Sequence, residues 1–311
     1  MDIQESTARK RAKEWGADIW LTDYKELLKM EEIDAVDICL PHHLHARVAI
    51  AALEAGKHVL LEKPIATTLA DADEILSVAR RAGVKFMIAE NVRFIPAHRL
   101  MKKLIDEGLV GRIFLARSHQ GGSEIRRLMD PQNWKGTPDK CGGGVLIDSG
   151  VHRIDLFRWI LGDVKAVYAW IAKQVVKLEN KCEDNALLLL KFKNQAIGEL
   201  DTSWTIVSPW NETVEIYGTK GTILVDLSRG LPLALYSEEM GNYWHHPRIE
   251  HSPTNWGEDS IRKEVQHFVD CILKDEEPEV KGEDGRTALE VALAAYESAR
   301  TGKIVELPLS W

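Results

Sequence analysis

The sequence predicts an α/β fold in which a parallel sheet covered by helices is followed by an α+β region with an open antiparallel sheet. Up to about residue 95, short apolar segments alternate with amphipathic helical segments, as in parallel strands linked by helices. After about residue 112 the apolar segments lengthen, and the pairs Lys193-Asn194 and Thr219-Lys220 between them are typical of hairpin turns. We therefore expect two domains, residues 1–95 and 96–311.

In the first domain, glycines and prolines mark the ends of the elements. Gly16, Gly56 and Gly83 each follow a helical segment and are typical of helix C-caps. Pro41 and Pro64 each follow a short apolar segment and end a strand. The expected helices cover residues 5–15, 23–30, 44–55 and 69–82, and the expected strands cover residues 19–21, 35–40, 58–61 and 85–89.

In the second domain, long strands separated by hairpin turns indicate an antiparallel sheet. The segment from Glu239 to Gly257 is rich in Trp, His, Pro and Asn, and we expect an ordered loop over a site or an interface. The two C-terminal helices are expected to pack back on the first domain. The expected strands cover residues 112–119, 164–175, 184–193, 195–206, 212–218, 221–226 and 303–307, and the expected helices cover residues 144–161, 258–274 and 285–301.

The composition excludes several classes of function. The 311 residues carry a net charge of −8 that is spread along the chain, which argues against nucleic-acid binding. The apolar runs are far too short to span a bilayer, and the charged first twenty residues do not resemble a signal peptide. The four cysteines form no C-x-x-C motif and are typical of reduced, mostly buried thiols. We expect a cytoplasmic protein without nucleic-acid or membrane partners.

The segment that follows three glycines, residues 142–144, is the first candidate for chemistry. It leads into an amphipathic helix in which Asp148 and His152 stand four residues apart, so that one helix face presents both side chains. The carboxylate would orient the imidazole and hold its charged form, and the imidazole would take up a proton near neutral pH. For an isolated Asp-x-x-x-His motif, a surface ion pair is the plainer interpretation.

Lys63 ends a strand of the predicted parallel sheet, at the edge where such sheets bind ligands. Its charge needs a partner there, and Glu62 is adjacent. We interpret Lys63 as a cation that binds a substrate hydroxyl and lowers the pKa of that hydroxyl. The alternative is a surface lysine before a turn proline. A cis peptide bond before Pro64 would be a purposeful feature.

Two other strand ends carry polar residues. Residues 41–45 contain three histidines, but no Cys, Asp or Glu cluster at metal-ligand spacing accompanies them, so we expect no metal and favour a helix start beside a cofactor. Asn91 and Arg93 end the last parallel strand, and Arg93 could bind a polyol, a carboxylate or a carboxylate at the domain interface. Tryptophans in loops, such as Trp204 and Trp210, could stack on sugar rings, although most tryptophans are core or interface residues.

Together these residues resemble the glucose–fructose oxidoreductase/inositol dehydrogenase/MocA family, and the resemblance covers nearly the whole chain. It rests on residues 33–36, 41–45, 56–64 and 142–155, which include a Glu-Lys-Pro motif and an Asp-x-x-x-His motif. The resemblance implies a Rossmann-like NAD(P)-binding domain, followed by an open-sheet domain that often mediates oligomers. It implies hydride transfer at a sugar or polyol carbon by a homo-oligomer, a dimer or tetramer assembled through the antiparallel sheet.

Carried over by position, the resemblance implies a role for each candidate residue. His152 is the implied general base, Asp148 its orienting partner, and Lys63 the group that polarises the same oxygen. Asp2 falls where the family has the acid that holds the ribose hydroxyls, and because no Arg stands near it, NAD is favoured over NADP. The implied substrate-binding residues are Lys63, Arg93, Asp148 and His152, and the implied cofactor-binding residues are Asp2, Pro41, His45, Glu62, Lys63 and Asn91.

The sequence departs from the family pattern ahead of Asp2. It has no G-x-G-x-x-G motif, and because the ribose-binding acid lies ~20 residues beyond that turn, about 30 residues of the expected domain are absent. We therefore expect an N-terminally truncated Rossmann-like domain, explained by a start codon assigned too late, by a natural truncation or, least favoured, by a strand from another source. The sequence predicts an NAD(P)-dependent oxidoreductase that transfers hydride between nicotinamide and a sugar, polyol or related hydroxy compound. The alternative is a non-catalytic ligand-binding or regulatory relative that has lost dinucleotide binding.

Overall fold

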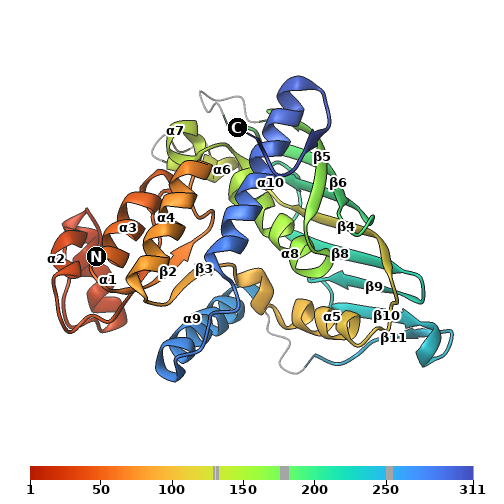
Figure 1. The fold of residues 1–311 in the computed structure, drawn as a ribbon, viewed down its shortest axis with the longest axis horizontal. Coiled ribbons are helices and arrows are strands. Elements are labelled where there is room, and N and C mark those ends of the chain that lie inside the picture. The colour runs from red at the N-terminus through yellow and green to blue at the C-terminus, as the bar shows by residue number, and fades with distance from the viewer. Residues whose placement is uncertain (129, 131–132, 176–181, 250–254, 311) are drawn as a thin grey trace.

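The computed structural model describes residues 1–128, 130, 133–175, 182–249 and 255–310, which form two sheets. A three-stranded parallel sheet is built from the N-terminal part of the chain, and a nine-stranded sheet from the remainder (Figure 1). The long helix α10 (Gly282–Thr301) runs between the two sheets and contacts both sides. Within the described ranges, no helix is both long enough and apolar enough to cross a membrane.

The parallel sheet has the strand order β1-β2-β3. The predicted strand at residues 19–21 is wrong: the segment is not paired into a sheet, and the side chains of Ile19 and Trp20 remain 48% and 38% exposed. The other expected elements of this part are present within a few residues of their predicted bounds. They are α1 (Glu5–Trp15), α2 (Tyr24–Leu28), β1 (Ala35–Ile38), α3 (His45–Glu54), β2 (His58–Glu62), α4 (Leu69–Ala82) and β3 (Phe86–Ala89).

Local signals explain where these elements begin and end. Thr68 caps α4 by accepting a hydrogen bond from the Asp71 backbone N–H at 3.1 Å. Gly83 ends the same helix with a φ of 67°, a backbone angle that favours glycine. The middle strand β2 carries the apolar run 59–61, in which each residue is at most 2% exposed. Apolar and polar residues do not alternate in this run, because both faces of a parallel sheet are covered.

The nine-stranded sheet has the order β11-β10-β9-β8-β4-β7-β6-β5-β12. Its neighbouring strands run antiparallel except for β4 and β7, which are parallel. The prediction of an antiparallel sheet is therefore correct for every pair but this one, and the exception arises because β4 is inserted between the hairpins β6–β7 and β8–β9. The strands are β4 (Ile113–Gly121), β5 (Val164–Ala172), β6 (Asn185–Phe192), β7 (Ile197–Ser203), β8 (Asn211–Gly218), β9 (Gly221–Asp226), β10 (Leu233–Ser237), β11 (Trp244–His245) and β12 (Val305–Glu306).

Three helices, α5 (Pro96–Asp106), α8 (Val151–Leu161) and α10, cover one face of the nine-stranded sheet, whereas no described helix covers the other (Figure 1). In strand β6, the residues that face the helices are buried and those on the other face are exposed. Leu188 and Leu190 are at most 1% exposed, whereas Leu187 and Leu189, which point to the opposite face, are 36% and 42% exposed. Helix α5 and strand β10 are additional elements that the sequence patterns do not predict.

The C-terminal helices α9 (Trp256–Lys274) and α10 also pack against the parallel sheet. The Ile88 backbone N–H in β3 donates to the Val280 carbonyl at 3.3 Å, and Arg286 of α10 pairs with Asp73 of α4 at 2.9 Å. These contacts fix α10 against the parallel sheet, and because α10 also packs on α8, they bring that sheet close to α8. Short helical segments complete the chain: η1 (His42–Leu44), η2 (Asn91–Phe94), α6 (Ile125–Leu128), η3 (Trp134–Gly136), α7 (Pro138–Cys141), the π-helical turn η4 (Leu146–Gly150) and η5 (Glu238–Met240).

Candidate active site

The carboxyl ends of β2 and β3 face the start of α8 across a cavity of about 660 Å³. Lys63 and Asn91 line it from the parallel sheet, and Asp148 and His152 line it from the segment that leads into α8. A smaller cavity of about 400 Å³ shares these four residues, so the two cavities meet at this point. The structure thus brings Lys63 and His152 together in one common space.

The glycine-rich segment ahead of α8 permits this close approach. Gly142 ends α7 with a φ of 85°. Gly144 passes so near the Glu183 backbone carbonyl that an added Cβ would collide with its oxygen, to which the Val145 backbone N–H donates at 3.0 Å. A side chain at position 144 would therefore displace the start of α8 from the cavity.

Lys63 lies just beyond β2, with its ammonium held against the π-helical turn. Nζ donates to the Asp148 backbone oxygen at 2.7 Å, and the Lys63–Pro64 peptide bond is cis, as predicted. Burial would lower the pKa of this lysine, but three nearby carboxylates raise the pKa above its ordinary value: those of Asp148, Glu62 and Glu90. The Lys63 side chain is therefore a cation at neutral pH and cannot act as a general base.

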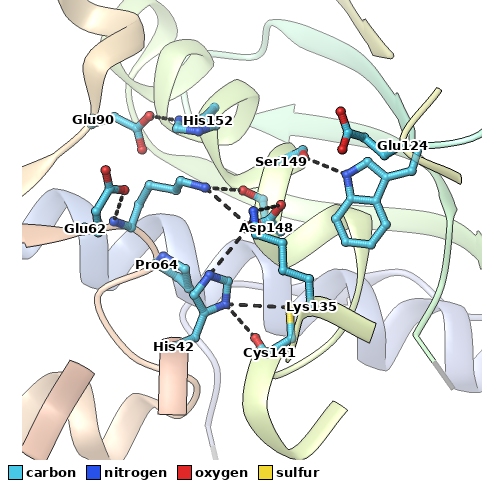
Figure 2. A network of polar contacts seen from close by, with 12 residues as sticks. His42, Glu62, Pro64, Glu90, Glu124, Lys135, Cys141, Asp148, Ser149 and His152 are labelled. Atoms are coloured by element: carbon cyan, nitrogen blue, oxygen red, sulfur yellow. Dashed lines mark hydrogen bonds and ion pairs between the residues drawn. The ribbon is translucent and has the colours of Figure 1, made fainter. Parts of the chain in front are cut away.

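The Asp148 carboxylate is 4% exposed and lies among three basic side chains (Figure 2). Lys135 Nζ donates to both carboxylate oxygens, at 2.7 and 2.8 Å. Lys63 Nζ and His42 Nε2 each lie 3.6 Å from Oδ1. Burial alone would raise the pKa of Asp148, but the charge of Lys63, the contact with His42 and the charge of Lys135 hold it well below its usual value. Asp148 is therefore ionised at neutral pH.

His152 pairs with Glu90, the residue that follows β3, and not with Asp148 (Figure 2). The predicted pairing of Asp148 with His152 is therefore wrong. That prediction assumed α-helical spacing, in which residues four apart share a face. Asp148 instead lies in the π-helical turn Leu146–Gly150, which inserts an extra residue into the turn and changes the direction of its side chain relative to that of His152.

The contact with Glu90 determines which nitrogen of the His152 ring carries the hydrogen. A carboxylate accepts hydrogen bonds, so Nδ1, the atom that contacts Glu90, is protonated. In the neutral ring Nε2 then has the free lone pair. His152 lines both cavities, with its side chain 14% exposed. A ring held in this way can accept a proton from a ligand hydroxyl.

Arg93 belongs to the packing between helices and not to the cavity walls. Its guanidinium makes two contacts of 2.6 Å with Asp155 of α8 and one of 3.4 Å with Asp284 of α10, and the side chain is 4% exposed. Of the three interpretations of Arg93, the structure has the interface carboxylate. Arg93 lines neither of the two cavities, and its substrate contact stays a prediction. A buried guanidinium needs carboxylate partners, and these two helices supply them.

Four predicted cofactor-binding residues, Pro41, Glu62, Lys63 and Asn91, line the smaller cavity. This cavity lies at the carboxyl ends of the parallel strands, where such sheets bind ligands. Glu62 Oε2 accepts from the Lys63 backbone N–H at 3.2 Å, and Asn91 Nδ2 donates to Ser260 Oγ at 2.9 Å. A carboxylate and an amide have more hydrogen-bonding positions than these contacts use. The lining therefore fits the hydroxyl and carboxamide groups of a nicotinamide nucleoside.

Two other predicted cofactor residues lie elsewhere. The His45 ring is fully buried, with its nitrogens 2.8 Å from the carbonyl oxygens of Pro64 and Leu40. The ring is thus enclosed by backbone contacts, and the cofactor contact of His45 stays a prediction. Asp2 is half-buried ahead of α1 and accepts a hydrogen bond from the Gln4 backbone N–H at 2.8 Å. It lies outside the two cavity linings, and its cofactor contact stays a prediction.

The histidines of residues 42–45 do not converge on one point. His42 Nδ1 and His43 Nδ1 lie 2.7 and 3.2 Å from the carbonyl oxygens of Cys141 and Lys140. Across the part of the chain that the structure describes, no group of His, Cys, Asp or Glu is arranged to hold a metal ion.

Two residues of the charged network are not predicted from the sequence. Glu90 directly follows β3 beside Asn91, and this position at a parallel strand end is the signal that could have identified it. Lys135 lies in the short helix η3, outside any recognised motif, and no sequence signal points to it.

The nine-stranded sheet and its loops supply the opposite wall of the larger cavity. Glu212 accepts hydrogen bonds from Gln120 Nε2 at 3.2 Å, Trp210 Nε1 at 2.9 Å and Arg153 Nη2 at 2.6 Å. Burial would raise the pKa of Glu212, but Arg153 and the other donors lower it to about 2. The end of the segment 239–257, expected to cover a site, reaches this wall, while residues 250–254 lie outside the described residues. The lining here includes Gln120, Trp204, Trp210, Glu212, Asn255 and Trp256.

Known protein families match both parts of this chain. Residues 1–90 match the model of an oxidoreductase family with an NAD-binding Rossmann fold, GFO/IDH/MocA, and residues 98–224 match the model of the GFO/IDH/MocA C-terminal domain. The uncharacterized oxidoreductase YrbE of Bacillus subtilis is 30% identical over 98% of this chain and 87% of its own length. The chain belongs to the Gfo/Idh/MocA oxidoreductase family.

Relatives within the family include named dehydrogenases. Myo-inositol 2-dehydrogenase of Thermotoga maritima is 28% identical over 98% of this chain and 89% of its own length. The solved structure of levoglucosan dehydrogenase in complex with NADH and levoglucosan superimposes with a TM-score of 0.91 at 26% identity, covering 99% of this chain and 89% of that one. The predicted family, its fold class and its class of NAD-binding oxidoreductase are thereby confirmed.

Proposed function

We propose that this protein is a dehydrogenase that transfers hydride between a nicotinamide cofactor and a hydroxyl-bearing carbon of a sugar, polyol or related hydroxy compound. The observation that carries the proposal is the convergence of the Lys63 ammonium and the His152 imidazole on one cavity, although distant parts of the chain supply them. Oxidation of an alcohol removes a hydride from carbon and a proton from oxygen. It therefore needs a proton acceptor and a group that stabilises the developing charge on oxygen.

Lys63 provides the electrostatic part of this chemistry. Its ammonium remains charged because neighbouring carboxylates raise its pKa. An ammonium has three hydrogens, and the Asp148 carbonyl takes one of them at 2.7 Å. The remaining hydrogens bind the substrate oxygen and stabilise its negative charge, an effect that is large in a site that excludes water.

His152 moves the proton. Its Nε2 accepts the hydroxyl proton during oxidation, and the imidazolium returns that proton to oxygen during reduction. Glu90, bound to Nδ1, keeps the ring in the required tautomer and stabilises its charged form. Asp148 belongs to the lysine network instead, where it keeps both ammonium groups close to the reacting oxygen.

The smaller cavity would hold the nicotinamide end of the cofactor, which when bound supplies the acceptor or donor of hydride. Pro41, Glu62 and Asn91 would contact it there. We favour NAD over NADP because Asp2 is acidic and no arginine directly follows it in the sequence. In this proposal residues 1–95 serve the cofactor and residues 96–311 serve the substrate.

The larger cavity would hold the substrate. Its volume of about 660 Å³ suits a small molecule. Trp210 and Trp256 line it, and their ring faces suit the apolar faces of a sugar or cyclic polyol, whereas Trp204 is 2% exposed and packs in the core. Relatives whose names specify myo-inositol or levoglucosan support the same class of compound.

The bare face of the nine-stranded sheet supports assembly into a homo-oligomer, a dimer or tetramer. Contiguous exposed apolar residues mark interaction surfaces. We define the outer patch as five residues of this face that are 36–57% exposed: Phe114, Trp170, Leu187, Leu189 and Ile197. The four cysteines are reduced thiols, three of them buried, which supports a cytoplasmic location.

A screen of polyols and sugars with NAD and with NADP tests the function. The expected result is the appearance of NADH with at least one uncharged polyol or sugar, and energy transfer from the tryptophans to bound NADH. A folded protein that neither binds NADH nor turns over any compound would contradict the proposal and favour the non-catalytic alternative, for which the relatives offer no support.

A further inference from the structure

Lys135 makes the direct hydrogen bonds to the Asp148 carboxylate. Its Nζ donates to Oδ1 and Oδ2 at 2.7 and 2.8 Å, as Figure 2 shows. Lys63 Nζ is 3.6 Å from Oδ1, a separation too long for a hydrogen bond, and donates instead to the Asp148 backbone oxygen. The two lysines therefore hold different atoms of the same residue.

The short helix η3 keeps Lys135 in this position. Asn133 Oδ1 caps the helix by accepting from the Lys135 backbone N–H at 3.1 Å. The Trp134 ring lies edge-on to His42, with ring centroids 4.7 Å apart, and His42 is itself held by the Cys141 carbonyl. The Lys135 side chain is 19% exposed and lines both cavities, so it lies where they meet.

A buried carboxylate requires a cationic or hydrogen-bonding partner. If Lys135 did not bind Asp148, the closest remaining ammonium would be that of Lys63 at 3.6 Å. A small movement would then join Lys63 to the carboxylate and direct its hydrogens away from the cavity. With Lys135 present, the carboxylate is satisfied and Lys63 keeps hydrogens for a ligand.

We propose that Lys135 is a positioning residue of the active site: by binding Asp148 it keeps the Lys63 ammonium available to the substrate oxygen. This inference rests on the proposed function.

Lys135→Met and Lys135→Arg test this role, with Lys140→Met on the exposed surface of the adjacent α7 as the matched control. Lys135→Met should lower kcat about 10- to 100-fold, less than the loss of a donor that touches the reacting oxygen. KM and the NADH dissociation constant should change by about twofold or less, since neither reports the chemical step. Lys135→Arg should retain most of the turnover because guanidinium also binds both carboxylate oxygens.

The Asp148→Asn background shows whether Lys135 acts through Asp148. If it does, adding Lys135→Met to Asp148→Asn changes kcat little, because the carboxylate that Lys135 holds is already absent. Losses that multiply in the double variant would overturn the proposal. So would turnover of Lys135→Met within about twofold of that of Lys140→Met. If Lys135→Met does not fold, Lys135→Gln serves in the same comparisons.

A further readout needs neither substrate nor cofactor. The pKa of Asp148 is lower in the folded protein than in the unfolded chain, so its interactions stabilise the fold at neutral pH and are lost as the pH falls through the folded-state pKa. The urea midpoint of unfolding should therefore differ less between neutral and acidic pH in Lys135→Met than in Lys140→Met. An equal difference in the two variants would contradict the contact between Lys135 and Asp148. A wild-type protein without turnover refutes the proposed function and this inference together, whereas an active wild type with an equally active Lys135→Met refutes the inference alone.

Discussion

The two walls of the larger cavity differ in how they use charge. The charged wall, defined as Lys63, Lys135, Asp148 and His152, directs an ammonium and an imidazole at the cavity, with Glu90 behind the imidazole. The sheet wall, defined as Gln120, Trp204, Trp210 and Glu212, contains one carboxylate whose two oxygens accept three hydrogen bonds from within the protein. The charged wall thus offers charged groups to a ligand, whereas the carboxylate of the four-residue sheet wall is already bound within the protein.

The difference indicates a division between chemistry and recognition. In the proposed function, the groups that exchange a proton or stabilise a charged oxygen stand on the charged wall, whereas the sheet wall offers aromatic surface and a fixed polar support. Substitutions on the charged wall should therefore lower kcat, and substitutions on the sheet wall should mainly raise KM. The following changes test that separation, from the largest expected effect to the smallest.

Lys63→Met should have the largest effect, because it removes the cation that faces the reacting oxygen. We expect kcat to fall about 100- to 1000-fold, as for the loss of a donor to a developing oxyanion. Initial rates of NADH formation measure the loss. Lys103→Met, a change at a side chain that is 69% exposed on α5, is the control. If Lys63→Met kept kcat and raised only KM, the charged wall would serve recognition and the comparison would fail.

Glu90→Gln should lower kcat about 10- to 100-fold, within the range contributed by positioned acid–base groups. The amide can still accept a hydrogen bond from His152 Nδ1 but no longer balances the charge of the imidazolium. Glu90→Asp should restore part of the rate, whereas Glu90→Leu, which cannot accept the hydrogen bond from His152, should lose more than Glu90→Gln. Initial rates of NADH formation measure these losses. A Glu90→Gln variant with the kcat of the wild type would contradict the role of Glu90 behind His152.

Trp210→Ala should raise KM about fivefold and change kcat by less than about threefold, since an aromatic contact contributes on the order of 1 kcal/mol. Trp210 also donates to Glu212 at 2.9 Å. Trp210→Phe keeps an aromatic ring but not this hydrogen bond. It therefore separates the effect of stacking on the substrate from the effect of the hydrogen bond to Glu212. A loss of kcat with unchanged KM would place chemistry on the sheet wall as well.

Leu189→Glu should have the smallest effect on turnover, because the outer patch faces away from both cavities. Leu189 is 42% exposed, and on β5 and β7 it stands opposite Tyr168 and Glu199. If the outer patch joins copies of this chain, a charge at position 189 should shift the protein toward monomers in sedimentation velocity. The kcat should stay within about twofold of that of the wild type. Lys103→Glu on α5, which covers the opposite face of the sheet, is the control for added charge. An unchanged mass would refute assembly through this patch.

Elements that depend on local patterns could be predicted from the sequence. The apolar run of β2, the Gly83 stop of α4, and the hairpin turns between β6 and β7 and between β8 and β9 lie where expected, because neighbouring residues specify them. The same holds for Lys63, whose place at a strand end follows from the strand itself. Residues 19–21 also look like a strand locally, but a strand forms only where a neighbouring strand is available to pair with it.

By itself the sequence determined the α/β order, the family and the two side chains, Lys63 and His152, that meet at the cavity. Only the tertiary structure decided their partners. Glu90 reaches His152, and Lys135 reaches Asp148, because a π-helical turn redirects Asp148 and because the packing of β3 and η3 sets which charges lie side by side. Helical spacing describes neighbours along one helix, whereas a buried carboxylate pairs with whichever cation the whole fold brings within reach.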